Sequence, residues 1–146
     1  MSQSILGQNT NAAASAVPKT QLSQLDVELA VAYLKEHYSG SASTGRCARA
    51  IRLALEAGGV VLRSHPINAK DYGKTLETSG FVKLKAANYT TKAGDIAVIQ
   101  PYKGGSTAGH ITMYDGAVWR SDFIQNDMWS GPGYRTNKPD HAIYRP

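Results

Sequence analysis

The chain has 146 residues and a formal net charge of +5, from 16 Lys and Arg against 11 Asp and Glu. This length suits one domain, and a 42% share of hydrophobic residues with 18% charged residues excludes wholesale disorder. The apolar runs are too short to span a bilayer, and a single cysteine, Cys47, excludes both an intramolecular disulfide framework and a multi-cysteine zinc site.

The first half of the chain predicts helices after a flexible start. Residues 1–20 are rich in Ser, Gln, Asn and Ala without periodicity, which indicates a loose arm, and they lack the basic start and apolar core of a Sec signal peptide. Helical spacing predicts helices over about 22–38 and 47–57, separated by the small-residue loop 39–45. A third helix is predicted over about 69–78.

The second half predicts a sheet. Strands are expected over residues 81–84, 95–100, 110–114, 118–123 and 142–145, and the tail around 131–140 is expected to be loop. Asp115-Gly116 is a strong hairpin signal between the third and fourth of these strands. Helices followed by an antiparallel sheet predict an α+β fold, with one domain over residues 21–146.

The positive charge does not by itself predict a partner. The basic residues are scattered, with no run of five or six like charges and no zinc-finger, Walker or RNP-type pattern. A net charge of +5 favours an anionic partner, and an anionic-polymer binding module is one interpretation of the chain. Neither nucleic acid nor a membrane is predicted as a partner.

The position of Cys47 suggests a nucleophile. It follows a loop of small residues and opens a predicted helix, where partial positive charge and unpaired amides lower the pKa of a thiol. The same amides are suited to hold an oxyanion. The alternative is an inert small residue of the core.

A thiol nucleophile requires a base, and His110 is the strongest of four candidates. His37 ends a helix, His65 precedes a proline in a turn, and His141 lies in the tail. His110 instead follows the Gly-rich loop 103–109 and opens a strand, where a base meets both solvent and substrate. A hydrogen-bonded structural histidine is the alternative.

The third member of the site depends on the hairpin register. A two-residue turn places Ser121 opposite His110 and sends Asp122 to the other face of the sheet. A three-residue turn places Arg120 opposite His110, and Asp122 then shares its face and orients the imidazole. Asn126 and Asp127 are the alternative acceptors.

Four ordered stretches carry a resemblance to a known group. The chain resembles the papain-like cell-wall amidases of the CHAP and NlpC type, closest in style to type VI secretion amidase effectors or small phage lysins. The stretches are Thr44-Gly45-Arg46-Cys47-Ala48, Ala69-Lys70-Asp71-Tyr72 to Ser79-Gly80-Phe81, Ala93-Gly94-Asp95-Ile96-Ala97-Val98-Ile99, and Gly109-His110-Ile111-Thr112-Met113-Tyr114-Asp115-Gly116 with Trp119-Arg120-Ser121-Asp122-Phe123.

The resemblance implies a papain-like fold and a cysteine hydrolase that cleaves an amide bond of peptidoglycan. Cys47 maps to the nucleophile, His110 to the base and Asp122 to the third polar position, where CHAP domains commonly have Glu or Asn. It implies no metal and no organic cofactor. Asp95 matches a Gly-Asp turn that is structural in the family.

The resemblance also implies a biological setting. We expect a monomer delivered to the periplasm of a target cell, with peptidoglycan as substrate and a cognate immunity protein as a partner. Tyr102, Trp119 and Trp129 are candidates to line the substrate cleft. A phage endolysin, a thiol-dependent deamidase and an inactive papain-like interaction domain remain as alternatives.

Overall fold

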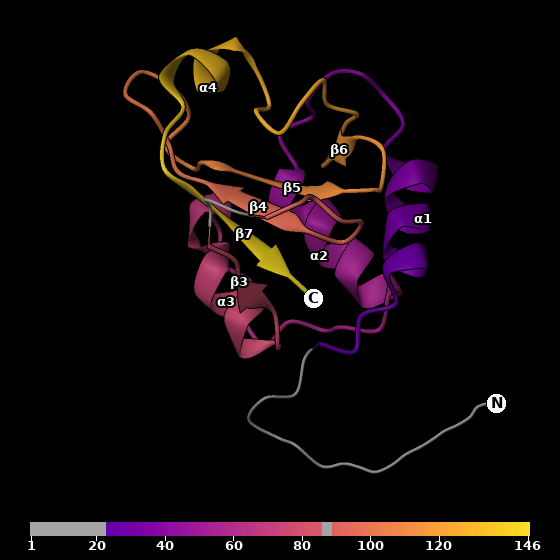
Figure 1. The fold of residues 1–146 in the computed structure, drawn as a ribbon. Coiled ribbons are helices and arrows are strands. Elements are labelled where there is room, and N and C mark those ends of the chain that lie inside the picture. Colours follow the sequence, from indigo (N-terminus) through magenta and orange to yellow (C-terminus); the bar gives the residue numbers. More distant parts are fainter. Residues whose placement is uncertain (1–22, 86–88) are drawn as a thin grey trace, which may run out of the picture.

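A computed structural model describes residues 23–85 and 89–146 (Figure 1). The predicted arm over residues 1–20 lies outside the described residues. The helices are α1 (Val27–His37), α2 (Cys47–Ala57), the 3-10 turn η2 (Ala69–Asp71), α3 (Tyr72–Thr78) and α4 (Pro132–Asn137). The strands are β3 (Val82–Lys83), β4 (Ile96–Ile99), β5 (His110–Tyr114), β6 (Trp119–Arg120) and β7 (His141–Arg145).

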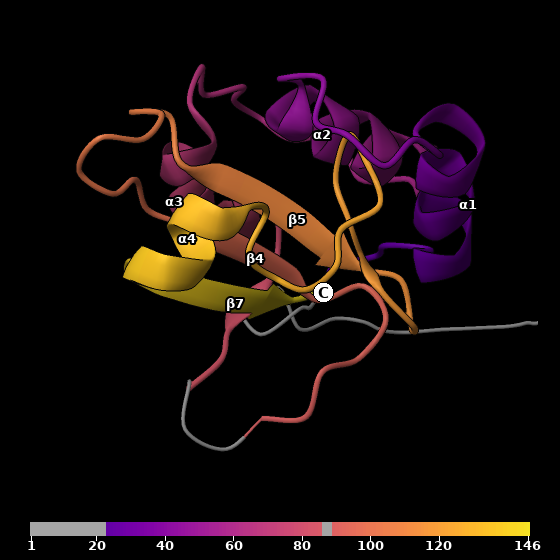
Figure 2. The same cartoon turned by 90° about the horizontal axis from the view of Figure 1, so that it is seen from above.

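The five strands form one antiparallel sheet in the order β3-β7-β4-β5-β6. Figure 2 shows α1, α2 and α3 along one face of this sheet, with α4 on the other side. The predicted α+β class, with N-terminal helices packed on an antiparallel sheet, is confirmed. Among the described helices none is long and apolar enough to cross a bilayer.

The alternation of side chains along β4 and β5 divides the core into two clusters. Ile96, Val98, Ile111 and Met113 face the helices, where they pack with buried residues of α1, α2 and α3. Ala97 and Ile99 point to the other face, into a cluster that contains Trp119, Tyr134 and Ile143. The sheet is therefore buried on both faces at β4, and all four residues of this strand are buried.

The short α4 corrects the prediction that the tail is loop. Pro132 occupies the first turn of this helix, where its fixed φ is favourable and its missing N–H costs nothing. Two contacts hold the helix: Arg135 forms two hydrogen bonds with the Asp127 carboxylate, at 2.9 and 3.1 Å, and the Tyr134 ring packs edge-on against Tyr102. Contacts with residues outside the helix, rather than its own propensity, stabilise it.

Asp95 ties the start of β4 to the end of β7. Its carboxylate is fully buried and receives two hydrogen bonds of 2.8 Å from the Arg145 guanidinium and one of 2.8 Å from the Lys92 N–H. A buried carboxylate is stable only when it is paired and hydrogen-bonded. Asp95 is therefore a structural residue.

We predict that Arg145→Ala lowers the free energy of unfolding by about 3 kcal/mol, because it leaves the Asp95 carboxylate buried without its cation. Urea unfolding followed by circular dichroism measures the loss. Arg135→Ala, which removes an ion pair between half-exposed side chains, is the control and should cost much less. Equal losses in the two variants would contradict the structural role of Asp95.

Candidate active site

Cys47 is the first residue of α2, as its sequence position predicts. The thiol is half-buried, and the helix carries its buried residues Ala50, Ile51, Ala54 and Leu55 on the face that packs into the core. Gly45, with a φ of 77°, reverses the chain just before the helix in the left-handed region that glycine tolerates. The helix thus presents its first turn, with its unpaired amides, around the sulfur atom.

The Asp122 carboxylate holds the loop that leads into this helix. Its Oδ2 atom accepts hydrogen bonds from the Thr44 N–H at 2.6 Å, the Thr44 hydroxyl at 2.9 Å and the Arg46 N–H at 3.0 Å. Asp122 is 2% exposed. Burial raises the pKa of this carboxyl, but the hydrogen bonds from Arg46 and Thr44 outweigh that effect, and the net pKa is lowered.

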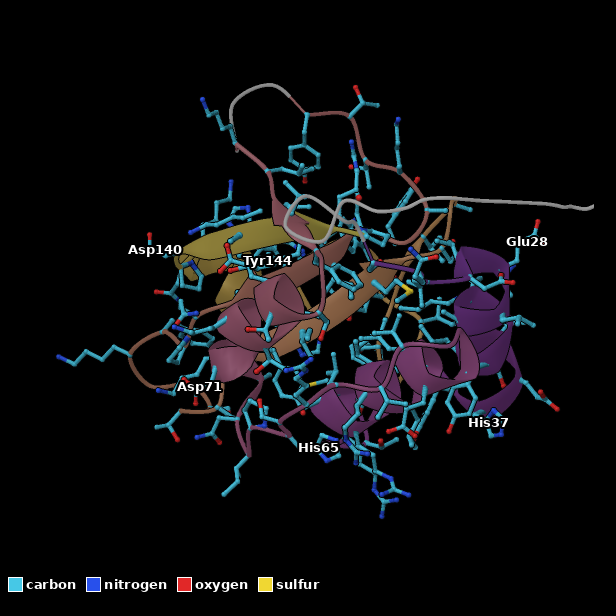
Figure 3. The ribbon with its side chains drawn as sticks, turned by 90° about the horizontal axis from the view of Figure 1, so that it is seen from below. Glu28, His37, His65, Asp71, Asp140 and Tyr144 are labelled. Atoms are coloured by element: carbon cyan, nitrogen blue, oxygen red, sulfur yellow. The ribbon has the colours of Figure 1, made fainter. Side chains whose placement is uncertain are left out.

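His110 is the only buried histidine of the four. His37 and His65 are exposed, as Figure 3 shows at the molecular surface, and His141 is exposed on β7. The His110 ring is near the rings of Phe123 and Tyr134, whose centroids are 6.4 and 6.1 Å away.

The Nε2 atom of His110 forms a hydrogen bond of 2.8 Å with Oε1 of Gln125, not with Asp122. The Gln125 amide is fixed, because its Nε2 donates to the carbonyls of Asp127 and Met128 and its Oε1 accepts from the Ser121 hydroxyl. With an oxygen facing it, Nε2 of the neutral imidazole carries the proton, and Nδ1 is left as the acceptor.

The predicted hydrogen bond between Asp122 and His110 is therefore wrong, and the reason is the turn after β5. Met113 pairs with Arg120 and Tyr114 with Trp119, which fits neither the two-residue nor the three-residue turn. The Asp115 carboxylate caps a longer turn by accepting from the N–H groups of Ala117 and Val118, each at 2.7 Å.

After β6 the chain reverses again and brings Gln125 back toward β5. The Ser121 N–H donates to the Phe123 carbonyl, and the Gln125 N–H donates to the Trp119 carbonyl, both at 3.0 Å. Of the alternative acceptors, Asn126 is exposed and the Asp127 carboxylate binds Arg135.

Cys47 and His110 are brought to one place through shared neighbours. Cys47 packs against the core cluster that contains Ile111, the residue that follows His110. The Asp122 charge raises the pKa of both the thiol and the imidazole, and the Tyr134 ring packs on His110. The nucleophile and base predicted from the sequence therefore lie in a common environment.

The electrostatics favour a neutral resting pair. Burial raises the pKa of the Cys47 thiol, and Asp122 adds to this, against the opposing effect of the Ile111, Ala48 and Cys47 backbone amides. Burial lowers the pKa of His110, more than Gln125 and Asp122 raise it. The thiolate–imidazolium pair expected from the helix terminus is thus disfavoured in the free protein.

The three predicted cleft aromatics differ in position. Trp119 is 9% exposed and packs on Tyr114 within the second core cluster, which leaves little of its surface for a ligand. Tyr102 lies against Tyr134, which contacts His110, and Trp129 lies edge-on to His141. Tyr102 is thus the one nearest to the site by contacts.

The residues described by the structure contain no group of three or more His, Cys, Asp or Glu side chains arranged to hold a metal ion. The candidate site consists of the Cys47 thiol, the His110 imidazole, the Gln125 amide and the Asp122 carboxylate.

We predict that Asp122→Asn lowers the free energy of unfolding at pH 7 by about 1–3 kcal/mol, because the loop before α2 loses charged hydrogen bonds. The pKa of Asp122 is lowered in the folded state. The contribution of its carboxylate to the free energy of unfolding is therefore present above about pH 4 and is lost as the pH falls through the pKa of the folded state. Urea titrations between pH 2.5 and 7, a range set by ordinary carboxyl pKa values, test this. The difference between the wild type and Asp122→Asn should shrink toward acid, whereas the exposed control Asp71→Asn should show no such convergence.

Comparison with known proteins places the chain in a family. No family model matches the chain, so the CHAP or NlpC assignment gains no separate support, and no curated protein matches it. A structure of the native type VI effector–immunity complex Tae3-Tai3 from Ralstonia pickettii is 39% identical, with a TM-score of 0.72, covering 82% of this chain and 97% of that chain. The selenomethionine form of that complex is also 39% identical, with a TM-score of 0.71, covering 80% of this chain and 98% of that one. At this identity and coverage, the chain belongs to the Tae3 family of type VI effectors.

Proposed function

We propose that this protein is a cysteine amidase that cleaves an amide bond in the stem peptide of bacterial peptidoglycan. The observation that carries the proposal is the arrangement around His110. The one buried histidine is held by a fixed Gln125 amide and shares its surroundings with a thiol at a helix N-terminus. Its similarity to type VI effectors supports delivery to the periplasm of a target cell.

The first step uses the resting pair directly. The hydrogen bond to Oε1 of Gln125 keeps the imidazole proton on Nε2 of His110. Nδ1 of His110 then accepts the proton of the Cys47 thiol as the sulfur attacks the amide carbonyl carbon. A tetrahedral intermediate forms with a negative charge on the former carbonyl oxygen. The backbone N–H groups of Cys47 and Ala48, at the first turn of α2, are the proposed donors to this oxygen.

The second half of the reaction returns the enzyme to its starting state. The imidazolium of His110 protonates the leaving amine as the C–N bond breaks, and an acyl thioester remains on Cys47. His110 then takes a proton from water, which attacks the thioester, and the proton returns to the sulfur as the acid product leaves. No metal or organic cofactor takes part in these steps.

Gln125 and Asp122 have separate positioning roles in this mechanism. Gln125 selects the imidazole tautomer, because both hydrogens of its amide are bound to main-chain carbonyls and only oxygen can face His110. Asp122 instead fixes the loop before Cys47, and so the direction of the first helical amides. We propose this division in place of a catalytic triad through Asp122.

The similar structures are complexes of an effector with its immunity protein. We infer that this protein likewise has a cognate immunity protein that inhibits it, and that the protein acts as a monomer on the cell wall.

We predict that the wild type releases soluble fragments from purified peptidoglycan and that Cys47→Ala and His110→Ala reduce the rate at least about 1,000-fold. Mass spectrometry of the fragments identifies the bond that is cut. His65→Ala, which removes an exposed histidine, is the matched control and should retain full activity. Intact peptidoglycan of several chemotypes after treatment with the wild type would refute the proposal.

The thiol should also report its protonation state through alkylation. Because the pKa of Cys47 is raised, we predict slower reaction with iodoacetamide at pH 7 than for free cysteine, with a rate that increases about tenfold per pH unit up to about pH 9. Mass spectrometry of the intact protein measures the rate. A rate independent of pH between about 5 and 8 would instead indicate a resting thiolate–imidazolium pair.

A further inference from the structure

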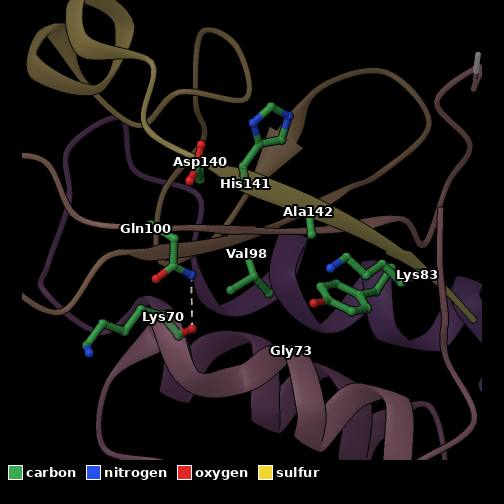
Figure 4. A pocket seen from close by; sticks show the side chains of 9 residues that line it. Lys70, Gly73, Lys83, Val98, Gln100, Asp140, His141 and Ala142 are labelled. Carbon is green, nitrogen blue, oxygen red and sulfur yellow. Dashed lines mark hydrogen bonds between the residues drawn. The ribbon is translucent and has the colours of Figure 1, made fainter. Parts of the chain in front are cut away.

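A cavity of about 180 Å³ opens between α3 and the strands β4 and β7 (Figure 4). Val98 and Ala142, paired across these two strands, and Gly73 of α3 form its apolar lining. None of the proposed catalytic residues lines it. The cavity is large enough for a group of several heavy atoms, well above the size needed for one water molecule.

Tyr144 brings a hydroxyl without a partner to this cavity. The residue is 6% exposed, and no side chain or backbone group in the described part of the chain forms a hydrogen bond with its hydroxyl. That hydroxyl lies over Gly73, where any side chain would overlap with it. The hydroxyl is therefore free to donate a hydrogen bond to a molecule in the cavity.

Lys83 brings a cation to the same cavity. It pairs with Tyr144 across β3 and β7, so the two side chains lie on one face of the sheet. Lys83 is exposed on this edge strand, and Figure 4 shows its side chain directed toward Ala142 at the mouth of the cavity. Within residues 23–85 and 89–146, no carboxylate forms an ion pair with Lys83.

The other charged groups at the rim do not neutralise this cation. Lys70 adds a second positive charge and is 3.9 Å from the Asp71 carboxylate. His141 is next to Ala142 on β7, so its ring lies on the opposite face, where it packs against Trp129. Asp140 is the one acidic residue of the lining, against the two cations Lys70 and Lys83.

We propose that this cavity binds the carboxylate of a small acyl amino acid or peptide end. The Lys83 ammonium pairs with the carboxylate, the Tyr144 hydroxyl donates a hydrogen bond to it, and Val98 and Ala142 contact the carbon atoms next to it. A carboxylate uses both donors, whereas an amide in the same place has no charge for Lys83.

Two hydrogen bonds connect the cavity to the segment that leads into β5, the strand that carries His110. The Gln100 amide donates to the Lys70 carbonyl at 3.2 Å, and the Lys70 N–H donates to the Ala108 carbonyl at 2.8 Å, two residues before His110. In the proposed reaction, the occupant of the cavity is a free carboxylate of the stem peptide. This identification of the occupant rests on the proposed function, whereas the binding of a carboxylate does not.

The test is a titration of the full-length Cys47→Ala protein, labelled with ¹⁵N and followed by NMR, with N-acetylalanine and N-acetylalaninamide. We expect the acid to shift the Gly73 and Ala142 amide signals saturably, and the amide to bind at least about tenfold more weakly. Lys83→Gln should weaken binding of the acid at least about tenfold, and Tyr144→Phe about threefold. Lys103→Gln, with the same change of charge in an exposed loop, should leave it unchanged.

Equal affinity for the acid and the amide, no saturable shift, or unchanged affinity in Lys83→Gln would overturn the inference. Lys83 is exposed on an edge strand, and signals distant from the cavity report whether the variant remains folded. This titration needs no hydrolysis. Saturable binding of the acid, together with a wild type that cuts no peptidoglycan, would therefore refute the proposed function and leave the carboxylate site standing. In an active protein, Lys83→Gln should raise KM and leave Cys47 alkylation unchanged.

Discussion

The hydrogen bonds of one carboxylate join the two halves of the active site. Asp122, in the turn that follows β6, reaches across to the backbone of Thr44 and Arg46, some 76 to 78 positions earlier in the chain. The loop before α2 is rich in small residues and has no side-chain cap of its own. The Ile124 N–H, which donates to the Gly40 carbonyl at 2.8 Å, joins the same loop to the same turn. Directed hydrogen bonds of this kind resist sliding of the helix past the strand more than apolar packing does.

The same contact carries an electrostatic cost at the thiol. A carboxylate near the start of α2 offsets the positive end of the helix dipole and opposes formation of the thiolate. The protein therefore gains a fixed loop and gives up part of the thiol acidity that a helix terminus supplies. General-base catalysis by His110 is compatible with a less acidic thiol, because the thiolate then has to form only when the carbonyl of the substrate amide is bound.

Much of the site was predictable from local patterns, and the rest depended on contacts between distant residues. The start of α2 at Cys47 and the bounds of β5 follow from the Gly-rich loops before them and from the periodicity after them. The hairpin register was not predictable from Asp115-Gly116 alone, because Asp115 uses its side chain to cap a longer turn. Gln125 gave no signal in sequence, since its role depends on main-chain carbonyls that only the folded loop presents.

The strand order has a kinetic consequence. β4, β5 and β6 pair with near neighbours in sequence, so this meander, with His110 in it, can form early from short loops. β7 instead lies between β3 and β4, and its pairing of Tyr144 with Ile96 closes a loop of almost fifty residues. β3 has no strand partner other than β7 in the described sheet and must wait for it. Insertion of β7 is then the late folding step, and the cavity that contains Lys83 and Tyr144 forms only when that step is complete.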